Sequence, residues 1–294
     1  HRGPSPCATQ SHGAAPSPLV GGPIHGGSKG CAYRFTGAYT EPKYSRGARG
    51  RIANSSYRQR NISPYLDYSW STCRVGGRYA HFWTNTNIPS ATSDGATVSL
   101  DLPEWKRERF YLFGEVDQIS DYLQKINLTG FTQLVQKEFS NQIDVTMVQT
   151  PMMTMERSML LDTYNKQRSY GATFQTDWTF GDSHYVVAGV DFLRDKLDAT
   201  DDREAYMIMT NMAGTTVISD ASGFGNYRYE GHQDTWAVFV QDEWSFAQDW
   251  TATIGLRQTW VRSSLDDTDN PDLATESSSD STLVATTTHV QLRL

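Results

Sequence analysis

The sequence predicts an all-β protein, an antiparallel up-and-down meander of about ten long strands that forms part of a transmembrane β-barrel. Apolar and polar residues alternate with a period of two along many segments, as they do in strands with one apolar and one polar face. The 294 residues contain no run of about 20 apolar residues, so a helical membrane protein is excluded. Short and long connections alternate between the segments, which is the layout of an outer-membrane meander.

The first 30 residues are rich in Pro, Gly and Ser and have no apolar core typical of a signal peptide. We therefore expect residues 1–30 to be a disordered or non-native segment. The first 60 residues hold 9 of the 26 Lys and Arg but only one of the 33 acids, Glu41. No nucleic-acid-binding module accompanies this basic arm, so we expect no nucleic acid as a partner.

In the first half of the chain the alternation is clearest at 61–70. Weaker alternation predicts strands at 31–41, 72–84, 107–118 and 121–138. In the clear segment, the apolar and aromatic side chains of Ile62, Leu66, Tyr68 and Trp70 oppose Asn61, Ser63, Tyr65, Asp67 and Ser69.

In the second half the clearest strand is 169–180, with Tyr170, Phe174 and Trp178 on one face. Strands are also predicted at 236–246 and 250–262, with weaker patterns at 184–198 and 282–294. Trp236 and Phe246 lie ten residues apart on one face, as do Trp250 and Trp260. At about 3.3 Å per residue and a tilt near 45° this spacing spans roughly 23 Å, close to the height of an apolar membrane band.

The connections predict a sheet with short turns at one end of its strands and long loops at the other end. Short turns are expected at 71–72, 118–121, 181–183 and 247–249, and long polar loops at 42–56, 85–106, 139–167, 199–231 and 266–281. Strands of about 10 to 16 residues with loops segregated in this way favour a membrane barrel over a soluble sandwich, which has shorter strands.

Several hairpins resemble those of TonB-dependent outer-membrane receptors. Val240-Gln-Asp-Glu-Trp244, followed after a short turn by Trp250-Thr-Ala-Thr-Ile254 and Gly255-Leu-Arg257, is similar to a barrel hairpin of that family. Two further stretches carry the likeness, namely Thr179 to Asp182 with Tyr185 to Asp191, and Asn54 to Tyr57 leading to Tyr65 to Tyr68.

The resemblance implies a 22-stranded barrel that surrounds an N-terminal plug domain. Residues 31–294 would then be a partial outer-membrane barrel from which the plug is absent. The last residues, His289 to Leu294, lack the terminal aromatic of a final outer-membrane strand. We therefore expect an internal piece of a larger transporter in the outer membrane of a Gram-negative bacterium.

The same resemblance implies energy-coupled uptake of an iron-bearing ligand, a siderophore or haem. The implied partners are outer-membrane lipid and, through the absent plug, a TonB-type energy-coupling protein; no cofactor is expected. The alternatives are a soluble all-β binding module and a ten-stranded protease resembling the omptins, with His232 and Asp234 at its lip. No GxSxG, HExxH or phosphate-binding glycine loop is present, so we do not expect an enzyme. Cys7, Cys31 and Cys73 have no paired spacing and predict no metal site.

The candidate ligand-binding residues lie in or beside the predicted long loops, where all eight methionines fall. Thioether sulfur is a soft ligand suited to Cu(I) and an adaptable contact for flat ligands such as porphyrin, although loops also use Met as filler. The candidates are His81, Trp83, Trp105, Met152, Met153, Met155, Tyr206, Met209 and His232. On the lumen face we expect a mixed charged wall of Arg74, Arg78, Glu115, Asp117, Lys125, Asp177, Asp191, Glu243 and Arg257.

Overall fold

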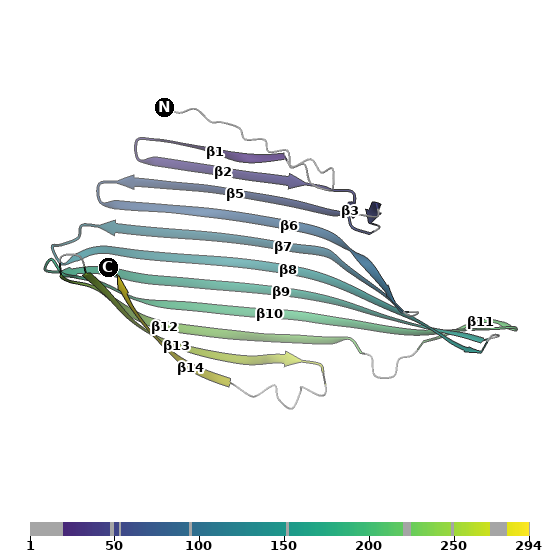
Figure 1. Ribbon diagram of the computed structural model, residues 1–294. Helices are drawn as coiled ribbons and strands as arrows, with labels where there is room; N and C mark the ends of the chain where they lie inside the picture. The colour runs from purple at the N-terminus through teal and green to yellow at the C-terminus, as the bar shows by residue number, and fades with distance from the viewer. Residues whose placement is uncertain are drawn as a thin grey trace.

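The computed structural model describes residues 20–47, 50–52, 54–93, 96–150, 153–219, 225–247, 250–270 and 281–293. These residues form one twelve-stranded antiparallel sheet and a small two-stranded sheet. Hydrogen-bonded neighbours in the large sheet follow the order of the chain, apart from one short strand, β11 (Figure 1). The predicted meander is therefore confirmed. In the described part of the chain, no helix has the length and apolarity needed to span a membrane.

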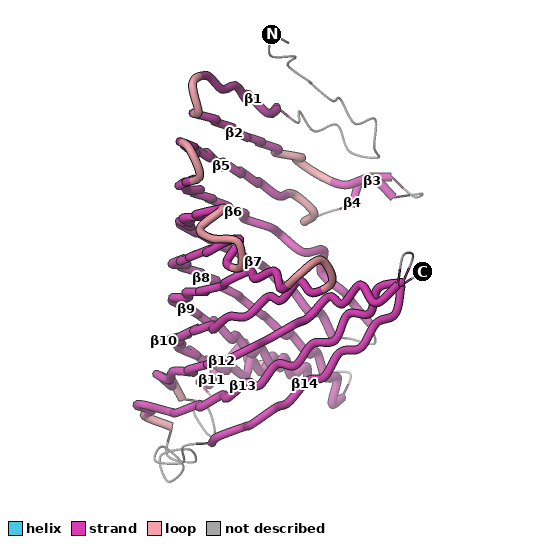
Figure 2. Tube along the Cα trace, turned by 90° about the vertical axis from the view of Figure 1, so that its left-hand side faces the viewer, coloured by secondary structure: helices cyan, strands magenta, loops and turns pink. Residues whose placement is uncertain are grey.

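Every one of the ten predicted strands is present. Along the sheet the strands are β1 (Val20–Ser28), β2 (Cys31–Thr40), β5 (Tyr57–Trp70), β6 (Cys73–Ser93), β7 (Ala96–Asp117), β8 (Leu123–Thr150), β9 (Met153–Phe180), β10 (His184–Asn211), β12 (Tyr227–Ala247), β13 (Trp250–Thr268) and β14 (Ser281–Arg293). Strand β11 (Gly214–Ser219) pairs with the end of β10, while β3 (Ser45–Gly47) and β4 (Gly50–Ile52) pair with each other. The sheet is twisted and curved, as two perpendicular views show (Figures 1 and 2).

The N-terminal segment differs from the expectation of disorder over residues 1–30. Val20–Ser28 forms β1 and pairs in continuous register with β2, from Val20 opposite Tyr39 to Ser28 opposite Cys31. Glycine-rich strands carry few side chains that could show an alternating pattern, yet their backbone groups still pair with a neighbour. Residues 20–28 are therefore part of the sheet, and residues 1–19 lie outside the described part of the chain.

The predicted long loops at 85–106, 139–167 and most of 199–231 are instead continuations of strands. Strands β8, β9 and β10 each run for 28 residues, and their ends project beyond the rest of the sheet (Figure 1). A transmembrane strand needs only about 9–11 residues. Past the bilayer the outer face becomes polar, as at Thr154, Glu156 and Ser158, while the inner face carries apolar side chains. The alternation therefore changes phase although backbone pairing persists. The short turns at 71–72, 118–121 and 181–183 are found where they were expected, and each contains a residue with positive φ, namely Ser71, Gln118 and Gly181. Residues 248–249 of the fourth lie outside the described residues.

The two faces of the sheet have the reverse of a soluble protein's polarity. On β9, Tyr170, Phe174 and Phe180 are 45%, 43% and 47% exposed, whereas Ser169 and Asp177 on the opposite face are 4% and 6% exposed. We call the face of Tyr170 the outer face and the face of Asp177 the inner face. Among the described residues the buried apolar side chains are small: Ala199, Ala205, Ala237, Ala252 and, outside the long strands, Pro42. A sandwich would bury its aromatic face, so the architecture is that of a barrel wall with its apolar face toward lipid.

Aromatic rings border the outer face at the short-turn edge. Ring centroids lie 5.7 Å apart for Tyr68 and Trp70, 6.4 Å for Tyr122 and Phe180, and 5.2 Å for Trp244 and Phe246. Ten residues up their strands, Trp236 and Trp260 stand directly opposite each other on β12 and β13. Two aromatic borders thus bracket the apolar band, as expected for residues at the two membrane interfaces.

Glycines on the inner face make room for aromatic rings of neighbouring strands. A Cβ atom at Gly189 would lie 2.5 Å from Cζ of Phe239 and 2.5 Å from the carbonyl oxygen of Phe174. Such distances are far below van der Waals contact, so a side chain at residue 189 would displace the ring or the neighbouring strand.

We predict that Gly189→Ala destabilises the full-length protein by about 1–3 kcal/mol, the usual cost of overpacking. The measurement is the urea midpoint of unfolding in lipid vesicles. Gly130→Ala is the matched control, because a Cβ there would meet nothing closer than 3.8 Å. Equal midpoints for the two variants would contradict the prediction.

Candidate functional site

All nine charged residues predicted for the lumen lie on the inner face, as the strand register requires. Arg74 stands opposite Glu115, and Lys125 stands opposite both Asp117 and Asp177. Asp191 is opposite Thr173, Glu243 is opposite Tyr185 and Arg257 is opposite Phe239, so these residues share that face. Directly paired residues in an antiparallel sheet project to the same side. The predicted charged wall is thus present.

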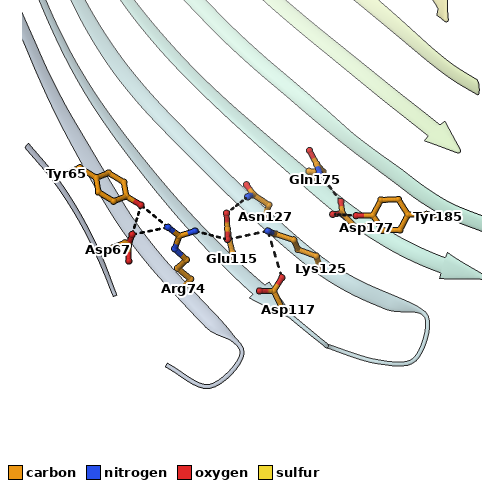
Figure 3. A network of polar contacts seen from close by, with 10 residues as sticks. All are labelled: Tyr65, Asp67, Arg74, Glu115, Asp117, Lys125, Asn127, Gln175, Asp177 and Tyr185. Atoms are coloured by element: carbon orange, nitrogen blue, oxygen red, sulfur yellow. Dashed lines mark hydrogen bonds and ion pairs between the residues drawn. The ribbon is translucent and has the colours of Figure 1, made fainter. Parts of the chain in front are cut away.

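Near the short turns the charges of this wall are linked across β5, β6, β7 and β8 (Figure 3). The buried Asp67 carboxylate accepts hydrogen bonds from the Tyr65 hydroxyl at 2.6 Å and from Nη2 of Arg74 at 2.9 Å. Arg74 also lies 3.8 Å from Glu115, which in turn lies 3.3 Å from Nζ of Lys125 and accepts a hydrogen bond from Asn127 at 3.2 Å. Acid and base alternate along this chain of contacts, which ends at Asp117, 3.9 Å from Lys125, so every charge in it has a partner of opposite sign.

On β9, β10 and β13 the carboxylates of the wall are held by neutral donors and by one arginine. Asp177 accepts hydrogen bonds from Gln175 and Tyr185, each at 2.8 Å (Figure 3). Asp191 accepts one from Thr173 at 2.7 Å and one from Nη1 of Arg257 at 2.6 Å. This lower wall is therefore a polar surface whose side chains are held in place by one another.

Most of the described methionines lie on strands rather than in loops, and five of them share one face, while Met212 lies in the turn after β10. The pairing of β9 with β10 has no bulge, so the odd residues of β9 keep the inner face from Asp177 up to Met153. Met155 stands opposite Met209 on β10 and Met147 on β8. We call Met153, Met155, Met159, Met207 and Met209 the methionine face. All five are half-buried. Met152 lies outside the described residues.

Trp105 is the one aromatic candidate on the inner face. Its ring meets that of Phe82 edge-on at 5.7 Å, and Nζ of Lys137 lies 6.0 Å from the ring centre. Trp105 is 41% exposed, so part of the indole is open to the space that the inner face borders.

The remaining candidates lie on the outer face, apart from the methionines. His81 lies 3.4 Å from Glu108, and the indole nitrogen of Trp83 donates to Glu104 at 3.2 Å. Nδ1 of His232 lies 2.7 Å from Asp266. Odd and even positions of a strand face opposite sides of the sheet. The sequence alone did not show which side these candidates take, because they were expected in or beside loops.

Tyr206 is also on the outer face, where its hydroxyl donates to Glu204 at 2.6 Å. That hydrogen bond, together with the negative charge of Glu204, raises the pKa of Tyr206 above its ordinary value. The phenol therefore stays protonated at neutral pH and is a hydrogen-bond donor rather than an anionic metal ligand. Within the described residues, no three His, Cys, Asp or Glu side chains are placed to hold a metal ion.

Sequence reasoning missed a group of arginines on the inner face, of which it named only Arg78. Arg34, Arg78, Arg107 and Arg109 line one cavity of about 460 Å³ together with Tyr65 and Tyr111. The available signal was the spacing of Arg107 and Arg109, two residues apart on one strand, which puts both side chains on the same face.

We predict that Asp67→Asn and Arg74→Gln are coupled by about 0.5–3 kcal/mol in a double-mutant cycle, because the two groups share a buried hydrogen-bonded contact. Unfolding midpoints of the full-length protein in vesicles provide the four free energies. The exposed pair Arg58 and Glu41 is the control and should show much weaker coupling, since its atoms are screened by water. Additive effects at Asp67 and Arg74 would contradict the network.

The sheet is similar to several solved structures. They include the copper transporter OprC (TM-score 0.62, 16% identity, 94% of this chain and 39% of that chain) and the ferric citrate transporter FecA in its unliganded form (TM-score 0.55, 12% identity, 96% and 39%). BauA, the ferric preacinetobactin receptor from Acinetobacter baumannii, matches with a TM-score of 0.50 and 18% identity over 94% of this chain and 42% of that chain. At these identities the likeness shows the fold alone. The chain spans about two fifths of the length of these structures.

No curated protein matches the sequence. A family profile described as "TonB dependent receptor-like, beta-barrel" matches residues 21–287, which is most of the chain. The match, the meander and the outward apolar face agree, and they leave no place for the soluble-module and protease alternatives. The chain belongs to the β-barrel family of TonB-dependent receptors, which are outer-membrane receptors and transporters of Gram-negative bacteria rather than enzymes.

Proposed function

We propose that the receptor containing this chain imports an iron-bearing ligand, a siderophore or haem, across the outer membrane. A TonB-type coupling protein acting on the plug would supply the energy. The proposal rests chiefly on one observation, the continuous inner face that joins the methionine face to the charged lower wall. The named ligands of two structural neighbours, ferric citrate and ferric preacinetobactin, belong to the same class.

Capture would take place on the extensions of β8, β9 and β10 beyond the bilayer. Residues 153–169 of β9 continue past Tyr170, which lies ten residues up the strand from Phe180 at the short-turn border, and this length corresponds to a height of roughly 40 Å at a 45° tilt. The methionine face lies at the far end of this wall. Unbranched thioether side chains adapt to flat or irregular ligands, and Trp105 adds an aromatic surface lower on the same face.

Below the capture region, the barrel wall would guide the ligand and support the plug. The linked charges of Asp67, Arg74, Glu115 and Lys125 form a polar, compensated surface against which a polar domain can pack and slide. On the outer face, the exposed aromatic and aliphatic side chains would be solvated by outer-membrane lipid.

Copper uptake is the second candidate function, and the register of the methionines favours it. Met155 has a methionine directly opposite on β10, Met209, and both side chains are half-buried on the inner face. Thioether sulfur is a soft ligand that selects Cu(I) over hard cations. A site of this kind would bind the bare metal ion without a chelator.

We predict that cells lacking their own iron receptors take up radioactive iron when they express the full-length receptor. Ferric citrate, a ferric catecholate, a ferric hydroxamate and haemin would be offered in turn, each with and without an uncoupler of the proton gradient. Saturable uptake of at least one compound, abolished by the uncoupler, is expected. If none of the four is taken up while Cu(I) is, the copper candidate replaces the iron-ligand proposal.

We also predict that replacing Met153, Met155 and Met209 together by Leu weakens binding of the transported compound about tenfold and leaves the barrel folded. Leucine keeps the apolar volume and removes the sulfur. Binding would be measured on the detergent-purified receptor by tryptophan quenching. Met212→Leu is the control, because Met212 is 86% exposed in the turn after β10. Unchanged affinity in the triple variant would exclude the methionine face as the capture site.

A further inference from the structure

The cavity lined by Arg34, Arg78, Arg107 and Arg109 differs from the rest of the inner wall in its charge balance. Among the described residues, no carboxylate lies within ion-pair distance of any of these four guanidinium groups. By contrast, Arg74, Lys125 and Arg257 on the same face each have acidic partners within 4 Å. The cavity therefore gathers four guanidinium groups that have no acidic partner among the described residues.

The four arginines are held by neutral groups. Nε of Arg78 donates to the Ser63 hydroxyl at 2.9 Å. Arg109 lies 4.4 Å from the ring centre of Phe131, and Arg34 lies 6.0 Å from that of Tyr65. Arg107 lies 5.9 Å from the ring centre of Phe82. Ring faces and a hydroxyl orient the guanidinium groups and leave donor atoms free, since stacking uses the plane of the group and not its N–H edges.

Four like charges around one cavity repel one another, and the repulsion is stronger inside a barrel than in bulk water. An anion that accepts hydrogen bonds from several guanidinium groups would relieve it, because arginine matches carboxylate and phosphate geometry with paired N–H donors. The cavity volume of about 460 Å³ is that of a site for a small molecule. Tyr65 and Tyr111 also line the cavity, and each contributes an apolar ring and a polar hydroxyl group.

The position of the cavity separates it from the capture region. Phe110 and Leu112, which alternate with Arg109 and Tyr111 along β7, are exposed on the outer face within the apolar band. The arginines therefore lie at the level of the bilayer, whereas the methionine face lies beyond it. A ligand that enters from the far ends of β8 to β10 would reach the arginines only on its way inward.

We infer that this cavity is a transit site for a small polyanionic ligand, one with two or more carboxylates or comparable anionic groups. The inference rests on the proposed import function and specifies the charge of the transported chelate. It assigns Arg34, Arg78, Arg107 and Arg109 as the groups that hold the anion partway through the barrel.

The test uses the purified full-length receptor in detergent and two probes of equal shape, tricarballylate and its uncharged triamide. Isothermal titration is expected to show binding of the tricarboxylate, weakening with added salt, and no binding of the triamide. Arg78→Gln with Arg109→Gln should weaken tricarballylate binding at least tenfold. Arg60→Gln is the matched control with the same charge change, because Arg60 stacks on Trp83 on the outer face; its affinity should equal that of the unmodified receptor.

If the double variant fails to fold, Arg78→Lys and Arg109→Lys replace it; each keeps the charge, loses the paired donors and should weaken binding severalfold. Absence of tricarballylate binding in the unmodified receptor, or equal binding in the double variant, would overturn the inference. So would a double variant that binds normally but exposes the plug to protease, which would mean that plug carboxylates occupy the cavity. The titration needs no coupling protein, so its failure leaves the uptake assay free to support import of a neutral or cationic ligand.

Discussion

The constraint on which the rest of the structure depends is the outward position of its apolar side chains. Trp236, Leu112 and Leu128 are each more than half exposed, although burying a side chain of this size stabilises a protein by about 1.5–3 kcal/mol. A chain can leave such residues on its surface only where a lipid phase covers them. Every backbone donor and acceptor must then pair within the sheet, which explains the unbroken register between neighbouring long strands such as β9 and β10.

Once the apolar face is turned to lipid, the polar face must line a lumen, and its charges must be balanced there. The lower wall achieves this balance internally, through Arg74 between Asp67 and Glu115 and through Arg257 on Asp191. The arginine cavity does not, so it depends on a charge supplied by something else. The same strand parity carries the inner face upward past the bilayer to the methionine face. The lower wall that would support the plug, the arginine cavity and the methionine face thus follow one another along the same inner face.

The order of the strands and their two faces could be predicted from the sequence, because a strand with lipid on one side has apolar residues at every second position. The alternation at 169–180 placed both faces of β9 correctly, and the aromatic pairs on β12 and β13 marked the band. The extensions could not be predicted, since over residues 139–167 the apolar side chains shift to the inner face and the outer face becomes polar, which breaks the pattern of the membrane band. For the same reason Met155 and Met209 were assigned to loops, and their shared face emerged only from the register. Strand β1 was missed because its glycines leave no pattern.

The central claim is that the odd residues of β9 face the lumen and the even residues face lipid. Nitroxide spin labels at successive positions from 169 to 178 of the full-length receptor in lipid vesicles would test it most directly. Collision with oxygen, which concentrates in lipid, should peak at even positions, and collision with a water-soluble nickel chelate should be highest at odd positions. Alternation in the opposite phase, or no alternation, would contradict the account.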